Sequence, residues 1–527
     1  MTRSTALYRP GSTGQALPVA VIGRRLLPWL LPLGLLVLWC AASKWHWTSK
    51  QVLPAPALVW QSAVELASGD LWLNVWISLK RLAAGVAAGV LGGALLGAWL
   101  GSNRLAERMV LPTFVALAQV PTLAWIPLFM LCFGIGEALK LVVLVKAVVV
   151  PVTLHTLVGV RDAQPRLREA ATVLGLSRSE RIRLLMIPAA LPAFLAGVRL
   201  ALAAGWASLL AVELLASSEG LGYLMVWARQ LFMLDIVFVC IAVIGLLGLA
   251  MDRGLGALER RLVFWPHPAI AQLRPGAATG PRWQAWVLPL VLFAAWHATS
   301  RLGWVNPELL PSPLRVAHTL VSGTADGTLP QALLTSLTRA LGGLAIGAGL
   351  GLAFGLLLGL WQPAHKLFGA TFSGLRQVAI FAWVPLITTW CGLGEPAKWA
   401  FVALAAFFPM LIAAQRGVAQ LPPTLIEAAC VLRLNRRQRL ARLVLPGCAP
   451  SLFAGLRVAL IYAWLGTIGA EYFMPSNGGI GSLMISAQQL LRMDQILAGM
   501  VLVGLTGALL NALGQTLERR ATRWRHA

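Results

Sequence analysis

The sequence predicts an all-α polytopic membrane protein made of two parallel repeats, each with about six transmembrane helices. Three observations predict this class: 58% of the residues are hydrophobic, only 12% are charged, and one pattern recurs at a constant offset. Soluble proteins carry about 25% charged residues, so the composition excludes an ordinary soluble enzyme. Apolar runs of about 20 residues, the length that spans a bilayer, occur repeatedly.

The repeat is clearest in two segments that begin 258 residues apart (427 minus 169). Residues 169–188 read EAATVLGLSRSERIRLLMIP, and residues 427–446 read EAACVLRLNRRQRLARLVLP. The same offset relates Arg81 to Arg339 and Glu213 to Glu471. Self-similarity at a fixed period indicates two copies of one domain in a single chain.

Each copy is expected to contain six membrane spans. The expected spans are 26–43, 75–100, 109–133, 138–157, 189–212 and 234–252, then 284–300, 333–360, 368–391, 397–415, 449–470 and 495–514. An even number of spans returns the chain to the side on which it entered. The two copies are therefore parallel, and such a pair can enclose a pathway between its halves.

The expected domain boundaries follow from the spans and from composition. They are an N-terminal tail (1–25), a first membrane domain (26–262), a linker rich in Arg, Pro, Gly and Ala (263–283), a second membrane domain (284–521) and a C-terminal tail (522–527). Most Lys and Arg residues fall in the tails, the linker and the loops on the same side of the membrane. By the positive-inside rule that side is cytoplasmic, which places both termini there. The net charge of +24 therefore indicates orientation, and we expect no nucleic-acid partner because no reading module accompanies it.

The second span of each copy carries glycines at every fourth position. They are Gly85, Gly89, Gly93, Gly97 and Gly101, and then Gly343, Gly347, Gly351, Gly355 and Gly359. Glycine at this spacing gives a flat helix face that another backbone can approach closely. We expect this face to serve helix packing.

The segment that follows the fourth span is too charged for the hydrocarbon core and too apolar for a disordered loop. Leu167, Ala170, Ala171 and Leu174 recur at helical spacing, and Gly175 then allows a turn. A second short helix is expected through Met186, before Pro188 and Pro192 start the fifth span. The pattern predicts a helix-turn-helix on the cytoplasmic surface with an apolar side for a partner's groove.

These segments resemble the signature of ABC-importer permeases, in which EAA and three further residues are followed by Gly. The stretches PTLAWIPLFMLCFGIGE (121–137) and AIFAWVPLITTWCGLGE (379–395) look like the sulfonate, taurine and nitrate branch of that family. So do SLKRLAAG (78–85), GVRLALAAGW (197–206) and their copies. The resemblance covers nearly the whole chain outside the N-terminal tail and the linker.

The resemblance implies a type I ABC importer-like permease fold with both halves fused. It implies that the motif forms a coupling helix that docks on a cytoplasmic ATPase. The residues that match are Glu169, Ala170, Ala171 and Gly175, and Glu427, Ala428, Ala429 and Arg433. The implied partners are two cytoplasmic ABC ATPase subunits and an extracytoplasmic solute-binding protein in a bacterial inner membrane. The implied cargo is a small solute such as a sulfonate, taurine or nitrate.

The second copy departs from the pattern where Arg433 replaces the turn glycine, Gly175. Arg enters the left-handed backbone region only at a steric cost. Either the two coupling elements differ in geometry, or the turn shifts to Leu434 and Asn435, because Asn tolerates that conformation. Pro121 is likewise replaced by Ala379.

The chain has no Gly-Lys dipeptide, so a Walker-type nucleotide site is excluded. The seven His residues are scattered and suggest no metal site. We therefore expect no cofactor in this chain and no enzymatic activity of its own. ATP is expected to bind to the partner subunits.

Six residues are candidates for the pathway or a gate: Arg199, Arg457, Glu213, Glu471, Trp125 and Trp383. An ionisable residue inside a span is a functional candidate by default. The two arginines can instead snorkel to the cytoplasmic surface or anchor the coupling loops. The two glutamates can simply end a helix at the interface, and the tryptophans can be packing residues.

Two other functions compete with the importer. A secondary transporter also often has twelve spans in two parallel halves. That class buries coupling charges at mid-membrane, and its loops have no reason to hold two EAA helices. A membrane scaffold does not explain a duplication that forms a pathway.

Overall fold

The computed structural model describes residues 18–47, 49, 51–161, 171, 173–265, 281, 283–474 and 478–523. Within these residues the secondary structure is helical and no strand occurs, so the all-α prediction is confirmed. Most of the predicted N-terminal tail and linker lies outside the described residues.

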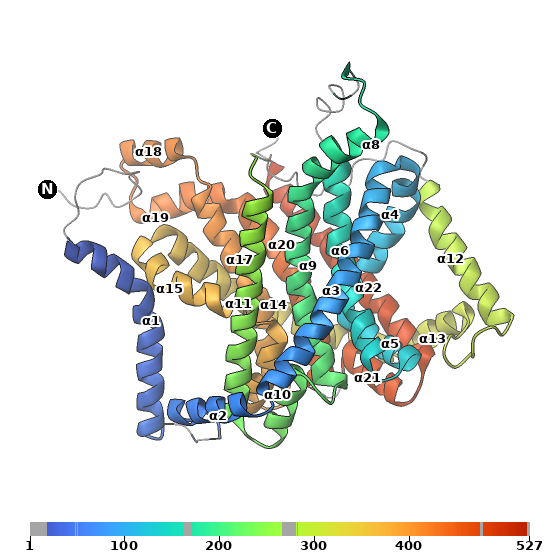
Figure 1. Cartoon of the computed structure of the whole chain (residues 1–527), viewed down its shortest axis with the longest axis horizontal. Helices are drawn as coiled ribbons and strands as arrows, with labels where there is room; N and C mark the ends of the chain where they lie inside the picture. The colour runs from blue at the N-terminus through green and yellow to red at the C-terminus, as the bar shows by residue number, and fades with distance from the viewer. Residues whose placement is uncertain are drawn as a thin grey trace.

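The two halves contain the same succession of helices where both are described, and the first-half counterpart of α18 falls largely outside the described residues. The first half comprises α1 (Pro18–Lys44), α2 (Pro56–Ser68), α3 (Leu71–Ser102), α4 (Arg104–Ala118), η1 (Thr122–Trp125), α5 (Ile126–Phe133), α6 (Glu137–Arg161), α8 (Arg178–Glu180), η2 (Arg181–Met186), α9 (Ile187–Ala216), α10 (Leu221–Gln230) and α11 (Leu234–Leu262). The second half comprises α12 (Gln284–Arg301), α13 (Pro313–Ala325), α14 (Thr328–Leu360), α15 (Gln362–Leu375), η3 (Ile380–Trp383), α16 (Val384–Cys391), α17 (Glu395–Ala419), α18 (Pro423–Val431), α19 (Arg436–Arg439), η4 (Leu440–Val444), α20 (Leu445–Phe473), α21 (Ile480–Gln489) and α22 (Met493–Ala521). Segments α8 and α18 lie on one side of the molecule, called here the motif face, and α2 and α10 lie on the opposite face (Figure 1).

Among the described residues, nine helices are long and apolar enough to cross a membrane, or up to eleven if each of two bent pairs counts as one span. The expected architecture of about six membrane helices in each repeat is confirmed, with two differences: the expected third span of each half is a bent pair, and the expected span 284–300 is not among the eleven. The expected span 284–300 forms helix α12, as predicted. It is not among the eleven because polar residues occupy both of its ends, including Gln284 and Arg301.

The expected third span of each half is broken by a sharp bend. Helix α4 meets η1 and α5 at 90°, and α15 meets η3 and α16 at 93°. Pro121 before η1 is extended (φ −52°, ψ 146°), and Ala379 before η3 takes nearly the same conformation (φ −58°, ψ 135°). The bend therefore does not depend on the proline that only the first half has.

The glycine faces pack as expected: α3 lies against α6, and α14 lies against α17. A Cβ added at Gly89 would stand 2.6 Å from the Val148 Cβ, and one at Gly97 would stand 2.6 Å from the Thr153 carbonyl oxygen. A Cβ added at Gly347 would fall on the carbonyl oxygen of Ala403. These helices can approach so closely only because the side chains are absent.

The first helix of each half packs on the other half. Helix α1 lies against α15, and α12 lies against α4, at opposite ends of the molecule (Figure 1). The Trp390 indole N–H of the second half also donates to the Val52 carbonyl oxygen of the first, at 2.8 Å. Because each half holds a helix of the other, the halves are interlocked.

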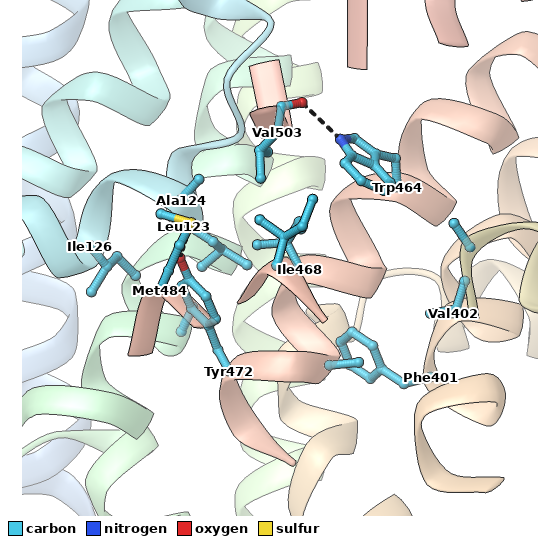
Figure 2. Close-up of a cluster of buried hydrophobic side chains, with 14 of the residues drawn as sticks. Leu123, Ala124, Ile126, Phe401, Val402, Trp464, Ile468, Tyr472, Met484 and Val503 are labelled. Atoms are coloured by element: carbon cyan, nitrogen blue, oxygen red, sulfur yellow. Dashed lines mark hydrogen bonds between the residues drawn. The ribbon is translucent and has the colours of Figure 1, made fainter. Parts of the chain in front are cut away.

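A cluster of buried hydrophobic side chains joins the halves at the centre. Leu123 and Ile126, just after the bend of the first half, share this cluster with Ile468, Tyr472 and other residues of α20 to α22 (Figure 2). The Trp464 indole N–H donates to the Val503 carbonyl oxygen at 3.2 Å, as Figure 2 shows. The bent segments of both halves thus take part in one hydrophobic cluster at the junction.

We predict that Gly347→Ala destabilises the protein by about 1–3 kcal/mol, because the added methyl group overpacks the contact with Ala403. Gly349→Ala on the same helix is the control, since nothing lies within 4 Å of its added Cβ. That change should leave stability equal or raise it, because Ala favours a helix by about 1 kcal/mol over Gly. The check is the apparent melting temperature in detergent, and equal melting temperatures for the two variants would contradict the packing account.

Candidate functional site

A cavity of about 1420 Å³ lies between the two halves. Its walls come from α6, α9 and α11 of the first half and from α17, α20 and α22 of the second, with the two bends. Glu259, Arg416 and Glu518, near the motif-face ends of their helices, line it, as do Leu123 and Phe381 of the central cluster. The cavity therefore runs from the motif face to the cluster, which closes it toward the opposite face.

The two intramembrane arginines noted in the sequence are paired with carboxylates. Arg199 Nε donates to Asp252 at 2.7 Å, and its NH1 lies 3.8 Å from Glu259. Arg457 NH1 donates to Glu518 at 3.0 Å. Arg199, Asp252, Glu259 and Glu518 line the cavity, and these salt bridges tie α9 to α11 and α20 to α22 there.

Three further cations line the cavity without a salt bridge to any described carboxylate: Lys146, Arg376 and Arg416. Their counterparts at the offset of 258 are the apolar residues Leu404, Ala118 and Val158. None of the three was predicted from the sequence, because the predicted site residues are ones that both copies share. The available signal was a lysine inside the expected span 138–157, which has no counterpart in the second copy.

At the opposite face, a buried arginine in each half organises an ion network. Arg81 donates to both oxygens of Glu137, at 2.9 and 2.6 Å, and to Glu213 at 3.1 Å. Glu213 also accepts from the Ser78 hydroxyl and from the Gly222 amide. The network joins α3, α6, α9 and the start of α10, and a bidentate Arg–carboxylate pair fixes orientation as well as charge.

The second half repeats this network. Arg339 donates to both oxygens of Glu395, at 2.8 and 2.5 Å, and to Glu471 at 2.8 Å. Glu213 and Glu471, the candidate gate residues, are each only 1% exposed. They hold the loops before α10 and α21 in place, and they do not line the cavity.

The tryptophans flagged as pathway candidates lie beside the bends. Trp383 lines the cavity, and the Lys146 ammonium lies 5.5 Å from the centre of the Trp125 ring. Trp206 and Trp464 line the cavity at equivalent places on α9 and α20. All four therefore lie at or near the junction of the halves.

The motif segment of the second half presents an apolar outer side. Within α18, Ala429 is buried, whereas Glu427 and Ala428 are exposed. Val431 is 83% exposed and Leu432 is 70% exposed. Such side chains at the end of a charged surface segment are typical of a contact with another protein.

The first half matches this pattern where it is described. Ala171 is buried, and Val173 and Leu174 are 88% and 73% exposed. Glu169 and Ala170 lie outside the described residues. The two motif segments therefore bury the same alanine and expose the same pair of apolar residues.

The turn after the motif is the same in both halves. Gly175 has φ +64° and Arg433 has φ +49°, so Arg433 adopts the left-handed conformation and the turn does not shift to Asn435, whose φ is −71°. The Leu176 amide donates to Ala171 O, and the Leu434 amide donates to Ala429 O, both at 3.1 Å. Of the two alternatives, neither a displaced turn nor a different geometry is present, and Arg433 bears a steric cost of about 1–2 kcal/mol.

A capping box follows each turn. The Ser177 amide donates to the Glu180 carboxylate at 2.8 Å, and the Glu180 amide donates to the Ser177 hydroxyl. The hydrogen bonds from the Ser177 hydroxyl and amide hold the pKa of Glu180 below its usual value. Asn435 and Gln438 form the corresponding box, which starts the second short helix in the second half.

Pro188 lies in the first turn of α9, as expected, but this helix does not start after a break. The short helix α8 continues through the π-helical turn η2 into α9, and α19 continues through η4 into α20. Each proline lacks an N–H, and the hydrogen-bond pattern changes to the wider turn just before it. The short helix after each motif turn is thus continuous with the helix that forms a wall of the cavity.

No group of three or more His, Cys, Asp or Glu side chains that could hold a metal ion occurs in the part of the chain that the structure describes. The described site contains charged walls, an apolar floor and exposed apolar surface segments. This arrangement can bind and enclose a small solute and contact a partner.

The chain matches the family described as "Binding-protein-dependent transport system inner membrane component" twice, over residues 89–264 and 345–524. It is 33% identical over 241 residues to the "Putative aliphatic sulfonates transport permease protein SsuC" of Bacillus subtilis (strain 168), covering 46% of this chain and 87% of that protein. It is 32% identical over 239 residues to the taurine transport system permease protein TauC of Escherichia coli (strain K12), covering 44% and 86%. It is 33% identical over 197 residues to the bicarbonate transport system permease protein CmpB of Synechococcus elongatus, covering 37% and 71%.

We predict that Glu213→Gln destabilises the protein by about 3 kcal/mol, because it breaks a buried ion pair by removing one partner. Glu219→Gln is the control, because that carboxylate is exposed and lies 3.8 Å from the same arginine. An exposed pair is worth about 1 kcal/mol or less, so the control should melt near the wild-type temperature. If both variants lose the same stability in thermal melts, the buried network does not hold this end together.

We predict that Arg433→Gly stabilises the second motif segment by about 1 kcal/mol, because glycine adopts a φ of +49° without steric cost. Amide hydrogen exchange across 423–434 should slow about fivefold. The control Arg437→Gly makes the same substitution inside α19. It should speed amide exchange in α19, because Gly disfavours a helix interior. Faster exchange in Arg433→Gly contradicts the assignment of strain to this turn.

Proposed function

Because the chain belongs to the family of binding-protein-dependent transport system inner membrane components, we propose that it is the whole membrane-spanning part of an ATP-driven importer. Both permease halves are then fused in one polypeptide. The observation that carries the proposal is the position of the motif segments. They expose apolar side chains on the face toward which the cavity between the halves extends.

The proposed partners at the motif face are two ABC ATPase subunits, one for each motif segment. Val173 and Leu174 in the first half, and Val431 and Leu432 in the second, supply the apolar contact. Glu169 and Glu427 then act as docking residues of the same segments, with the motif face cytoplasmic. ATP binds to these partners, because this chain lacks a Walker-type sequence.

Movement would pass from the ATPases to the pathway through the helices that follow the motif segments. Helices α9 and α20 form cavity walls, and each is reached from its motif segment through one tight turn and a short helix. When ATP brings the two ATPases together, the motif-face ends approach each other and the cavity narrows there. The central cluster then parts toward the opposite face, where a solute-binding protein delivers cargo.

The proposed cargo is a small solute, and a small anion fits the charges of the cavity best. The relatives are named for transport of sulfonates, taurine and bicarbonate. The three carboxylates of the described cavity lining, Asp252, Glu259 and Glu518, lie in salt bridges with two arginines, Arg199 and Arg457, and the lining also contains Lys146, Arg376 and Arg416. We propose that the solute-binding protein selects among such solutes and that this chain catalyses no reaction.

The function is tested by co-reconstituting the chain in liposomes with candidate ABC ATPase and solute-binding proteins from the same organism. Uptake of the solute that the binding protein holds should require ATP on the side of the liposome membrane to which the ATPases bind. Uptake that persists without the ATPase but follows an ion gradient would indicate a secondary transporter and overturn the proposal.

We predict that Val431→Asp reduces ATPase retention in co-purification at least tenfold, because the charge disrupts an apolar contact worth about 1.4 kcal/mol or more. Glu427→Arg should reduce it likewise through charge reversal at the same helix. Leu490→Asp is the control, since it places the same charge on an exposed leucine at the opposite face. Equal retention of the ATPase by Val431→Asp and Leu490→Asp contradicts docking at this segment.

A further inference from the structure

Lys146 is an isolated cation deep in a membrane-spanning helix. It lies nine residues after Glu137 (146 minus 137), about 14 Å along α6 at 1.5 Å per residue, and about 22 Å before Arg161. Its side chain lines the cavity between the halves. An ionisable residue at this depth is expensive to place, so its presence calls for a partner or a ligand.

The described partners of the ammonium are neutral. Lys146 Nζ donates to the Val120 carbonyl oxygen at 2.9 Å and to the Thr122 hydroxyl oxygen at 3.2 Å. An ammonium has three N–H donors, so these two bonds leave one donor. No described carboxylate lies within salt-bridge distance, and the positive charge is not neutralised by the protein there.

The lysine is not needed to build the bend that it contacts. The second half makes the same bend, 93° against 90°, with Leu404 in place of Lys146 and Ile380 in place of Thr122. The Val120 and Val378 amides also make the same turn hydrogen bonds, to Leu117 O and Leu375 O. The ammonium is therefore an addition to a backbone that forms without it.

The other charges of the cavity favour an anion. The carboxylates of its lining are held in salt bridges with Arg199 and Arg457, as described above. Arg376 and Arg416 line the cavity without such a bridge. A negatively charged solute entering this space thus meets more cations than carboxylates among the described lining residues.

We infer that Lys146 forms a binding site for a small oxyanion in the cavity and that the transported solute occupies it on its way through. The remaining N–H of the ammonium donates to an oxygen of the solute, and the Thr122 hydroxyl donates to a second. The site takes monoanions with a compact oxygen-bearing head, such as a sulfonate or bicarbonate. This inference rests on the proposed import function and adds a contact of the permease itself with cargo.

The first test measures binding without transport. The purified full chain with its ATPase, but without the solute-binding protein, is mixed with radiolabelled methanesulfonate in a scintillation proximity assay. Wild type should bind saturably, Lys146→Met should bind at least tenfold more weakly, and Lys146→Arg should stay within about threefold. Lys80→Met removes an exposed lysine outside the cavity lining and should bind as wild type does.

The second test measures uptake by the complete importer at saturating binding protein. Lys146→Met should lower the maximal rate of anion uptake at least tenfold, with ATPase retention unchanged. The inference is overturned if wild type binds no methanesulfonate, if Lys146→Met binds it normally, or if equimolar chloride displaces it completely, which would indicate a resident halide. Loss of binding with normal uptake also overturns it. The binding assay involves no import, so failure of ATP-driven uptake in wild type refutes the proposed function separately.

Discussion

A buried arginine in each half is the interaction on which the rest of the structure depends. Arg81 and Arg339 each bind two carboxylates and a loop carbonyl at the opposite face. A buried charge that loses one partner is strongly destabilising, so these networks fix three long helices and the following loop relative to one another. No comparable buried network is described at the motif-face ends of those helices. The opposite-face end of each half is thus held by buried ion pairs, whereas the ion pairs described toward the motif face, such as Arg199–Asp252 and Arg457–Glu518, are partly exposed.

Fusion and interlocking shape how that movement is shared. Helices α1 and α12 pack on the opposite halves, and the two bent segments meet in the central cluster. Neither half can therefore move without the other. The two halves share one backbone arrangement but differ in charge, because Lys146, Arg376 and Arg416 have apolar counterparts in the other half. A single polypeptide permits such divergence, since each half always meets the same partner.

The sequence predicted the features that duplication and hydropathy determine: the all-α class, the two copies and the packing of the glycine faces. It could not predict the 90° bends, because η1 and α5 together are as apolar as a straight span and Ala379 bends like Pro121. It placed Glu213 near a gate, whereas burial of that carboxylate depends on the distant residues Ser78 and Arg81. Lys146 was not predicted because the site residues were inferred from positions that the two copies share, and its counterpart is Leu404.

The central claim is that the two halves rock against one another, so that the cavity opens alternately to the two faces. Spin labels test it directly. One pair is placed by Leu258→Cys and Leu517→Cys near the motif face, the other by Leu231→Cys and Leu490→Cys at the opposite face, in a chain without its native cysteines. When a non-hydrolysable ATP analogue binds the ATPase complex, pulsed electron paramagnetic resonance should record a shorter distance between the labels near the motif face. The distance between the labels at the opposite face should become longer. Unchanged distances in the nucleotide-bound complex would contradict the account.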